Sequence, residues 1–267
     1  MHLVILPYYC EEEVRRYEEI AAYLFNLHGA QPQIEFLLSS LSSMKSQPQL
    51  EGIFERIAPV KTFRVQTEIE SYPQRPTVMF WETMEFVQRH YEADGGFVLW
   101  LESDMLPVRA GWVRSLEGEW QSRAGLLLMG RHVPCLNFRG ASYVEHINGG
   151  ACYAKHFAEI VSPENRGAPF DLTLFESIQP TGRWLSSAQF DFSTPGLLAR
   201  DIQDERKTIL HGYKQDKDLF IRQGIQKSLR HHSGLRPRWR ESLPLLAVKP
   251  CCEASIGPFW SRTCPLH

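Results

Sequence analysis

The spacing of apolar positions changes several times along the chain, and each change predicts a different element. His2 to Tyr8 is a continuous apolar run, which predicts a buried first strand. From Cys10 to Leu27 the apolar side chains follow helical spacing, and Ile34 to Leu38 is a second apolar run. Strand, helix and strand in this order indicate a right-handed βαβ unit with parallel strands.

The alternation continues into the middle of the chain. The same criteria predict a loop at 41–49, strands at 60–67, 97–101 and 126–129, and helices at 77–91 and 107–123. The strand from Phe97 to Leu101 is short, aromatic and apolar throughout, which is typical of a strand buried on both faces. No repeat or linker divides the pattern. We therefore predict an α/β fold with a mostly parallel central sheet, flanked by helices, in a single domain.

Two carboxylates follow the strand from Phe97 to Leu101. Glu102 and Asp104 flank Ser103, and the segment breaks at Pro107. The carboxyl ends of strands are where open α/β sheets bind ligands. Carboxylates gathered there can hold a hard divalent cation, which often shares its oxygen ligands with substrate phosphates. The alternative is an ordinary acidic turn.

A second candidate segment is Asn148-Gly149-Gly150. Both glycines tolerate positive φ and a close approach of the backbone to another group. The Asn148 amide can both donate to and accept from the hydroxyl groups of a ligand. A plain hairpin turn is the alternative. Residues 151–160 are expected to pack behind this segment as a strand or a helix.

Two polar residues in the second half are also candidates. His211 follows a short apolar pair and is itself followed by Gly212 and Lys214. Asp171 precedes an apolar helical pattern, so it is either a helix N-cap or a general base. Glu176 is a weaker second candidate for the base, because it lies within the helical pattern.

Taken in order, the βαβ start, Glu102-Ser103-Asp104, Asn148-Gly149-Gly150 and His211-Gly212-x-Lys214 resemble the GT-A glycosyltransferases. The acidic triplet is similar to the Asp-x-Asp motif of that family in a Glu-x-Asp variant. The resemblance implies a GT-A (Rossmann-like) catalytic domain at 1–226, with a nucleotide-binding half at 1–105 and an acceptor half at 106–226. Residues 227–267 are expected to form an irregular C-terminal extension.

The resemblance also implies roles for the candidate residues. Asp104, Glu102 and His211 would hold a divalent metal, and mixed oxygen and nitrogen ligands suit Mn²⁺ better than Mg²⁺. Ser103 and the Asn148-Gly149-Gly150 segment would lie beside the donor, and Lys214 would meet its diphosphate as a point charge.

Four early residues are expected to frame the nucleotide. Pro7 and Tyr8 end the first predicted strand, and Tyr8 would stack on or border the base. Ser39 follows the second strand, and either Ser39 or the next residue, Ser40, would reach a ribose hydroxyl. Arg75 opens the helix after the third strand and would face a phosphate or the base. For each of them, plain loop surface is the alternative.

The implied reaction is sugar transfer from a nucleotide diphosphate donor to a glycan, glycolipid or glycoconjugate acceptor, in the synthesis of a polysaccharide or glycoconjugate. UDP is the family's usual nucleotide, and GDP stays open. If Asp171 is the base, the product is inverted. The alternatives are a nucleotidyltransferase or other nucleotide-binding enzyme, and a non-catalytic binding module. Residues 7–13 contain no glycine, which disfavours a nucleotidyltransferase phosphate loop.

Composition and charge limit the possible partners and the expected location of the protein. The chain has 267 residues, 43% apolar and 22% charged, with a net charge of −2, which argues against a nucleic-acid partner. It lacks a transmembrane-length apolar run and a secretory signal pattern, so we expect a cytoplasmic location. The six scattered cysteines predict buried free thiols, with Cys251 and Cys252 more exposed. The basic segment from Arg230 to Arg240 is a solvated tail, or it contacts an anionic membrane surface or a lipid-diphosphate acceptor.

Overall fold

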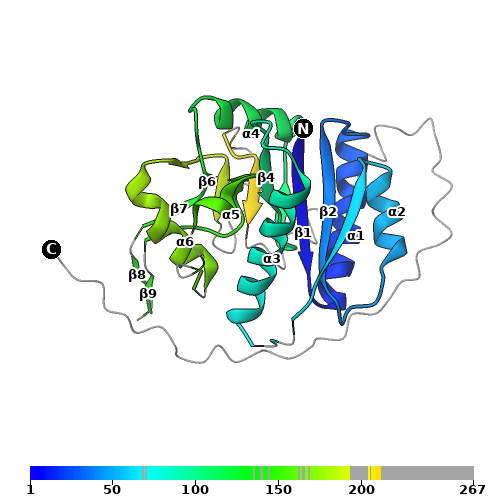
Figure 1. Ribbon diagram of the computed structural model, residues 1–267. Helices are drawn as coiled ribbons and strands as arrows, with labels where there is room; N and C mark the ends of the chain where they lie inside the picture. The colour runs from blue at the N-terminus through cyan, green and yellow to red at the C-terminus, as the bar shows by residue number, and fades with distance from the viewer. Residues whose placement is uncertain are drawn as a thin grey trace.

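The computed structural model describes residues 1–67, 69, 71–134, 136–138, 141–143, 145–161, 163, 166–167, 169–192, 204 and 206–211. Within these residues a seven-stranded sheet runs through the middle of the molecule (Figure 1), in the strand order β12-β6-β11-β4-β1-β2-β3. Its strands are β1 (His2–Tyr8), β2 (Ile34–Leu41), β3 (Val60–Val65), β4 (Phe97–Trp100), β6 (Leu128–Gly130), β11 (Cys152–Ala154) and β12 (Trp184–Ser186).

The sheet is mostly parallel, as the sequence predicts. β1 pairs in parallel with β2 and β4, β2 with β3, and β6 with β12. The exception is β11, which runs antiparallel to both of its neighbours, β4 and β6. Every residue of β1 and β4 is buried, which confirms that the sheet is covered on both faces.

Two groups of helices cover the two faces of the sheet. Phe36 of β2 packs on Phe54 of α2 (Pro48–Glu55), with ring centroids 4.7 Å apart. Ser39 of the same strand lies 2.7 Å from Thr83 of α3 (Gln74–His90), measured between their hydroxyl oxygens. Residues 36 and 39 point to opposite faces of a strand, so α2 and α3 lie on opposite sides. The helix α1 (Glu11–His28) packs beside α2.

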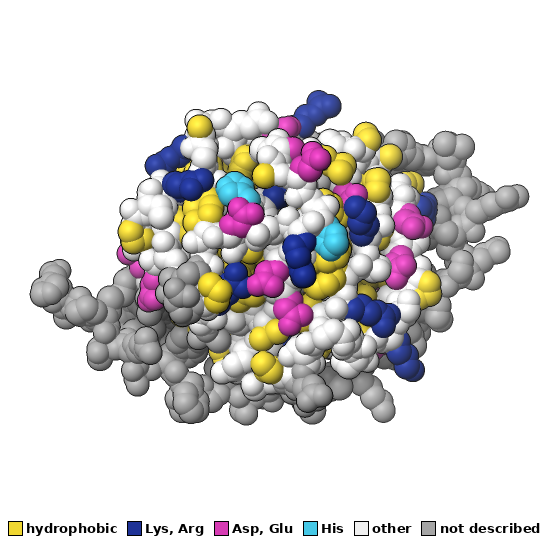
Figure 2. Space-filling model, viewed as in Figure 1, with side chains coloured by type: hydrophobic (Ala, Val, Ile, Leu, Met, Phe, Trp, Pro, Cys, Tyr) yellow, Lys and Arg dark blue, Asp and Glu magenta, His cyan; other side chains and the backbone are white. Residues whose placement is uncertain are grey.

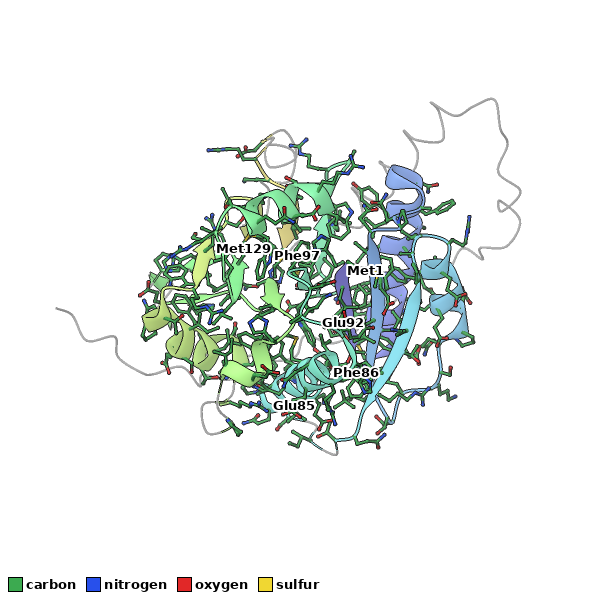
Figure 3. The ribbon with its side chains drawn as sticks, turned by 45° about the horizontal axis from the view of Figure 1, so that its top comes forward. Met1, Glu85, Phe86, Glu92, Phe97 and Met129 are labelled. Atoms are coloured by element: carbon green, nitrogen blue, oxygen red, sulfur yellow. The ribbon has the colours of Figure 1, made fainter. Side chains whose placement is uncertain are left out.

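The core lies between these layers. Figure 3 shows Phe97 and Met129, both fully buried, inside the molecule, whereas Glu85 of α3 lies at its outer edge. On the surface viewed in Figure 2, the acidic and basic side chains of the described residues are intermixed. None of the helices in the described part of the chain is long and apolar enough to cross a membrane.

Several element boundaries differ from the sequence prediction. The predicted loop at 41–49 is wrong at both ends, because Leu41 belongs to β2 and α2 begins at Pro48. The sequence does not mark α2 clearly because it is short and buries only Leu50 and Phe54. The helix predicted from Pro107 begins instead at Trp112 (α4, Trp112–Gln121), because residues 105–107 form the strand β5 (Met105–Pro107).

The second half is built from short elements. After β6, the described segments are β7 (His132–Val133), β8 (Leu136–Phe138), β9 (Ala141–Tyr143), β10 (His146–Ile147), α5 (Phe157–Ile160), α6 (Phe170–Ile178), a 3₁₀ turn (Gln179–Thr181), β13 (Phe190–Phe192) and β14 (Ile209–His211). The strands β13, β14 and β5 form a small separate sheet in that order. Residues 151–160 contain both a strand, β11, and a helix, α5.

Candidate active site

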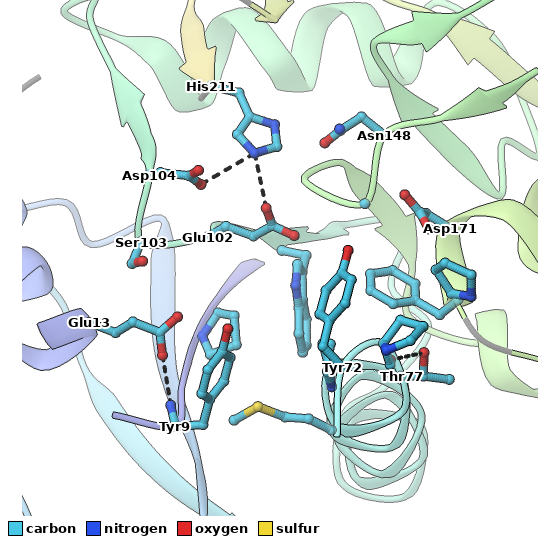
Figure 4. Close-up of a pocket in the computed structure, with 18 of the residues that line it drawn as sticks. Tyr9, Glu13, Tyr72, Thr77, Glu102, Ser103, Asp104, Asn148, Asp171 and His211 are labelled. Carbon is cyan, nitrogen blue, oxygen red and sulfur yellow. Dashed lines mark hydrogen bonds and ion pairs between the residues drawn. The ribbon is translucent and has the colours of Figure 1, made fainter. Parts of the chain in front are cut away.

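A cleft of about 330 Å³ opens at the carboxyl ends of β1 and β4. It is the place where an open α/β sheet is expected to bind a ligand. Figure 4 shows many of its side chains. The lining residues are Pro7, Tyr9, Glu13, Arg16, Tyr72, Pro73, Pro76, Thr77, Met79, Trp100, Glu102, Ser103, Asp104, Asn148, Gly149, Pro169, Phe170, Asp171 and His211.

The acidic triplet forms a turn between β4 and β5. The backbone N–H of Met105 donates to the carbonyl of Glu102 at 2.9 Å, which closes the turn. The backbone N–H of Glu102 contacts the Met105 sulfur at 3.3 Å. Ser103 is buried and lines the cleft. The turn therefore presents both carboxylates of the triplet to the cleft, at the end of the strand where the sequence places them.

Strand pairing brings His211 to the triplet. β14 runs antiparallel to β5, and this register places His211 opposite Met105, next to Asp104. The His211 Nε2 lies 3.0 Å from Glu102 Oε2 and 3.3 Å from Asp104 Oδ1 (Figure 4). A separation of more than 100 residues along the chain is thus closed by one short strand.

These three side chains, which we call the Glu–Asp–His cluster (Glu102, Asp104, His211), can converge on one ion. One ligand atom from each residue lies within 4.8 Å of the others. Two carboxylates and one imidazole offer the mixed oxygen and nitrogen ligands that Mn²⁺ accepts readily. The geometry fits a divalent cation at the position where Nε2 of His211 faces the two carboxylates.

The two carboxylates also determine the protonation state of His211. Burial lowers the pKa of His211, but hydrogen bonds to Asp104 and Glu102 and their negative charges outweigh it and raise the pKa to about 10. The imidazole is therefore charged at neutral pH, and it neutralises part of the negative charge of the two carboxylates.

A buried tyrosine fixes the two strand ends that frame the cleft. The Tyr17 hydroxyl of α1 lies 2.7 Å from the carbonyl oxygen of Leu101 and 3.0 Å from that of Pro7, so its single proton is shared between them. Pro7 is near the end of β1, and Leu101 directly follows β4. This contact ties α1 to both strands and holds the acidic turn against β1.

The Asn148-Gly149-Gly150 segment approaches the cluster closely. A Cβ on Gly150 would lie 2.3 Å from the Met105 sulfur, and one on Gly149 would lie 2.7 Å from Phe170. Neither glycine has a positive φ, so close approach alone explains both. The neighbours are protein side chains. Gly149 lines the cleft, and Gly150 lies behind it against Met105.

The segment is not a hairpin turn, because the strands on either side of it pair elsewhere. β10 pairs with β7, and β11 pairs with β4 and β6. Asn148 Oδ1 accepts a hydrogen bond from the backbone N–H of Gly150 at 3.1 Å, which fixes the side chain. Figure 4 shows Asn148 on the opposite side of His211 from Asp104. It lines the cleft.

Asp171 lines the cleft from the first turn of α6. The N-cap of this helix is Pro169, so Asp171 is not the cap that the sequence allowed. Its Oδ1 accepts from the backbone N–H of Leu172 at 3.1 Å, and its Oδ2 lies 3.8 Å from His146 Nε2. Burial raises the pKa of Asp171 and the charge of Glu102 adds to that shift, while His146 opposes it. A raised pKa favours accepting a proton.

Two of the early residues lie away from the cleft. The prediction that Ser39 follows a strand is wrong: it lies inside β2, 0% exposed, with its hydroxyl against Thr83. Tyr8 lies within β1, is 3% exposed and does not line the cleft. Alternation along the strand explains the difference, because the neighbouring Tyr9 faces the cleft instead. These positions do not fit direct contact with a nucleotide.

Pro7 and Arg75, unlike Ser39 and Tyr8, lie in or next to the cleft. Pro7 lines the cleft. Arg75, in the first turn of α3, is half-buried and holds its guanidinium 5.6 Å from the centroid of the Tyr9 ring. Arg75 Nε also donates to the carbonyl of Ile69 at 3.3 Å. Arg75 therefore contacts a cleft residue without lining the cleft itself.

The sequence reasoning missed several lining residues, among them Tyr9, Glu13, Arg16 and Tyr72. The acidic run of residues 11–13 indicates only the first turn of a helix. In the structure, Glu13 Oε2 accepts from the backbone N–H of Tyr9 at 2.8 Å. Burial and the charges of Glu102 and Asp104 raise the pKa of Glu13 to about 7, against the N–H of Tyr9 and the charge of Arg16. Figure 4 shows Glu13 on the same side of the cleft as Ser103.

Several predicted features lie outside the described residues. These are Gly212 and Lys214, the basic segment 230–240, the predicted extension 227–267, and Cys135, Cys251, Cys252 and Cys264. The two described cysteines, Cys10 and Cys152, are free thiols, and Cys152 is buried.

Comparisons with known proteins find the same architecture in solved structures. No protein-family model and no curated sequence matches the chain. The mouse xyloside xylosyltransferase 1 matches with a TM-score of 0.52 at 12% identity, over 80% of this chain and 98% of its own. The galactosyltransferase LgtC, solved with donor and acceptor sugar analogs, matches with a TM-score of 0.53 at 13% identity. The match covers 90% of this chain and 100% of the LgtC chain.

A third structure agrees. The glycosyltransferase GlyE of Streptococcus pneumoniae TIGR4 matches with a TM-score of 0.51 at 11% identity, over 88% of this chain and 64% of its own. Identity at this level speaks for the fold alone. Together with the mostly parallel sheet and its flanking helices, these likenesses show that the chain adopts the GT-A fold found in these glycosyltransferases.

Proposed function

We propose that this protein is a metal-dependent glycosyltransferase. It moves a sugar from a nucleotide diphosphate donor, a UDP-sugar in our proposal, to a glycan, glycolipid or glycoconjugate acceptor, as one step of polysaccharide or glycoconjugate synthesis in the cytoplasm. The observation that carries the proposal is the convergence of Glu102, Asp104 and His211 at the strand ends of a GT-A fold. The three structural relatives described above, which are glycosyltransferases by name, support it.

The Glu–Asp–His cluster supplies the ligands for the cation. A divalent cation held there, Mn²⁺ in our proposal or Mg²⁺, would act as a Lewis acid that neutralises the charge of the leaving diphosphate. Asp104 and Glu102 contribute oxygen, and His211 contributes Nε2 once it has lost its proton. Their mutual hydrogen bonds orient the three side chains before any ligand binds.

The nucleotide lies, in this proposal, against the wall formed by β1 and α1. Pro7 and the Tyr9 ring supply an apolar surface for the base, with the Arg75 guanidinium beside Tyr9. Arg16 lines the same wall and brings a positive charge to the cleft. Arg16 contacts the largely exposed Glu12 through Nη2, and the other N–H groups of its guanidinium can donate to a phosphate.

Asp171 is the general base of the proposed reaction. Its Oδ1 accepts from the helix backbone, and its Oδ2, which faces His146 Nε2 at 3.8 Å, takes the proton of an acceptor hydroxyl. Burial and the nearby Glu102 raise its pKa, so the carboxylate is a better proton acceptor than a solvated one. A base on the acceptor side assists direct displacement, and the product is then inverted at the sugar carbon.

The test is a product assay with the full chain. The protein is incubated with UDP-sugars and GDP-sugars in MnCl₂ or MgCl₂, and the released nucleotide is separated by chromatography. We expect one nucleotide diphosphate to be released, and the release to be lost on Asp104→Asn, which keeps the side-chain size. Pyrophosphate release from a nucleoside triphosphate would instead identify a nucleotidyltransferase. Nucleotide binding without any turnover would identify a binding module.

A further inference from the structure

An exposed tyrosine, Tyr72, lines the cleft. Among the described residues four large hydrophobic side chains are substantially exposed: Met1, Ile69, Tyr72 and Ile160. Tyr72 is the most exposed of them, at 75%, and of the four it alone lines the cleft. Because most of this ring is in contact with solvent, its burial adds little to the stability of the fold.

The backbone around Tyr72 is nevertheless fixed. The backbone N–H of Arg75 donates to the carbonyl of Ser71 at 2.8 Å, across Tyr72. The Thr77 hydroxyl donates to the carbonyl of Pro73 at 2.9 Å. Tyr72 therefore stands directly before the first turn of α3, and its ring is presented by a rigid helix start.

The neighbours of Tyr72 complete an uncharged surface. We call it the Tyr72 wall: Tyr72, Pro73, Pro76, Pro169 and Phe170, all of which line the cleft. Phe170 is held from behind by Phe80, with ring centroids 4.0 Å apart and planes 11° from parallel. Figure 4 shows the Tyr72 hydroxyl pointing toward the gap between Glu102 and Asp171. Both carboxylates lie close enough to act on it electrostatically.

Charge limits what can bind against this wall. The described lining residues carry four carboxylates, at Glu13, Glu102, Asp104 and Asp171, against the cations of Arg16 and His211. Arg16 is on α1, and His211 belongs to the Glu–Asp–His cluster. An anionic group next to Asp171 would meet a like charge, and His146, the basic side chain beside Asp171, does not line the cleft. A neutral molecule with hydroxyls and an apolar face meets neither obstacle.

We infer that the Tyr72 wall is the acceptor subsite and that it takes an uncharged pyranose ring, which stacks its C–H face on Tyr72 and points a hydroxyl at Asp171. This narrows the acceptor to a neutral sugar and excludes a lipid diphosphate as the group bound there. The inference rests on the proposed function, because Asp171 has a role only if a sugar is transferred.

The proposed transfer forms one bond at the donor sugar carbon and breaks another. The acceptor oxygen forms a new bond to the donor sugar carbon, and the bond from that carbon to the phosphate oxygen breaks. The hydroxyl proton passes to Asp171, and the nucleotide diphosphate leaves with the electron pair. The part assigned to Tyr72 is to orient the acceptor, so it makes and breaks no bond.

The experiment is an NMR titration of the full chain with ring-labelled tyrosine. The probes are methyl β-D-galactopyranoside, methyl β-D-glucopyranoside and methyl α-D-mannopyranoside, with farnesyl diphosphate as the anionic lipid. Each is added with and without saturating UDP or GDP and Mn²⁺. The Tyr72 signal is assigned by its loss in Tyr72→Phe, which keeps the ring and is expected to keep binding.

We expect one pyranoside to shift the Tyr72 signal, and Tyr72→Ala to weaken its binding about tenfold. Ile69→Ala, an exposed apolar residue outside the cleft, serves as the matched control and leaves binding unchanged. The inference is overturned if no pyranoside shifts Tyr72, if Tyr72→Ala binds the sugar as well as wild type, or if Tyr72→Ala weakens the binding of farnesyl diphosphate more than that of every pyranoside.

Two outcomes separate this inference from the proposed function. If UDP or GDP binds the wild type but no pyranoside reaches Tyr72, the inference fails and the proposed function stands. If neither nucleotide binds under any condition, the proposed function fails. A loss of nucleotide affinity in Tyr72→Ala would place Tyr72 on the nucleotide wall and would also overturn the inference.

Discussion

The Glu–Asp–His cluster and the Tyr72 wall face the same cleft with opposite chemistry. The cluster gathers three ionisable side chains within 4.8 Å of one another, and the charged imidazole of His211 partly neutralises the two carboxylates. The wall gathers prolines and aromatic rings, and its most prominent member, Tyr72, is 75% exposed. A site with one charged side and one uncharged side suits two different ligands, a cation-bound phosphate and a neutral ring.

Asp171 lies where the two sides meet, and replacing it should have the largest effect on the reaction. We expect Asp171→Asn to lower sugar transfer by about 10²–10⁴-fold, because the amide cannot accept the acceptor proton. Nucleotide binding at the cluster should persist. The product's anomeric configuration, read by ¹H NMR of the wild-type reaction, should be inverted.

The matched control for Asp171 is Glu176→Gln on the same helix. Glu176 is exposed and lies outside the cleft, so transfer should be unchanged. A retained configuration, or full activity in Asp171→Asn, would show that Asp171 is not the base.

The cluster should bind its cation more tightly as the pH rises. The pKa of His211 is about 10, so at neutral pH the imidazole must release a proton before Nε2 can bind a metal. The Mn²⁺ affinity should therefore rise with pH below that value, by at most about tenfold per pH unit. Calorimetry in buffers of different ionisation enthalpy counts the released proton. Binding without any proton release would contradict the assigned state of His211.

The same shift bears on the stability of the metal-free protein. The folded pKa of His211 lies above its ordinary value of 6.5, so its contribution is complete below pH 6.5 and is lost as the pH rises toward about 10. Denaturant unfolding at several pH values without metal should show stability falling over this range. The fall should be smaller in His211→Gln.

The glycine behind the cluster gives a smaller, structural effect. Gly150→Ala would push a Cβ into Met105, the residue opposite His211 in the β5–β14 pair. We expect a loss of about 1–3 kcal/mol in the free energy of unfolding, with weaker metal binding. Gly118→Ala on α4 is the control, since nothing lies within 4 Å of the added Cβ. Equal free energies of unfolding of the two variants would show that Met105 moves aside without a loss of stability.

The sequence predicts the cluster better than the wall because the cluster has a local signature. A buried strand followed by two carboxylates is visible in Phe97–Asp104, and continuous apolar runs such as His2–Tyr8 mark the central strands. Only the resemblance to the GT-A glycosyltransferases predicts that His211 is a metal ligand. The contact that brings it to Asp104 is made by two three-residue strands, β5 and β14, which are too short to show a period.

Other residues could not be placed for reasons that lie in tertiary structure. Ser39 is polar, but its hydroxyl bonds Thr83 of a helix that the chain reaches about 40 residues later, so it is buried inside β2. Tyr8 and Tyr9 are identical in type, and the register of β1 alone decides which of them faces the cleft. Tyr72 lies in a turn-rich segment, where no pattern distinguishes a ligand surface from a solvated loop.

The most direct test of the central claim is calorimetric titration of UDP and of GDP, each with and without Mn²⁺, into the wild type and Asp104→Ala. The account predicts that one of the two nucleotides binds only with Mn²⁺, and that Asp104→Ala abolishes this binding. Binding that is indifferent to both Mn²⁺ and Asp104 would contradict the role of the Glu–Asp–His cluster. Binding of neither nucleotide under any condition would contradict the glycosyltransferase proposal itself.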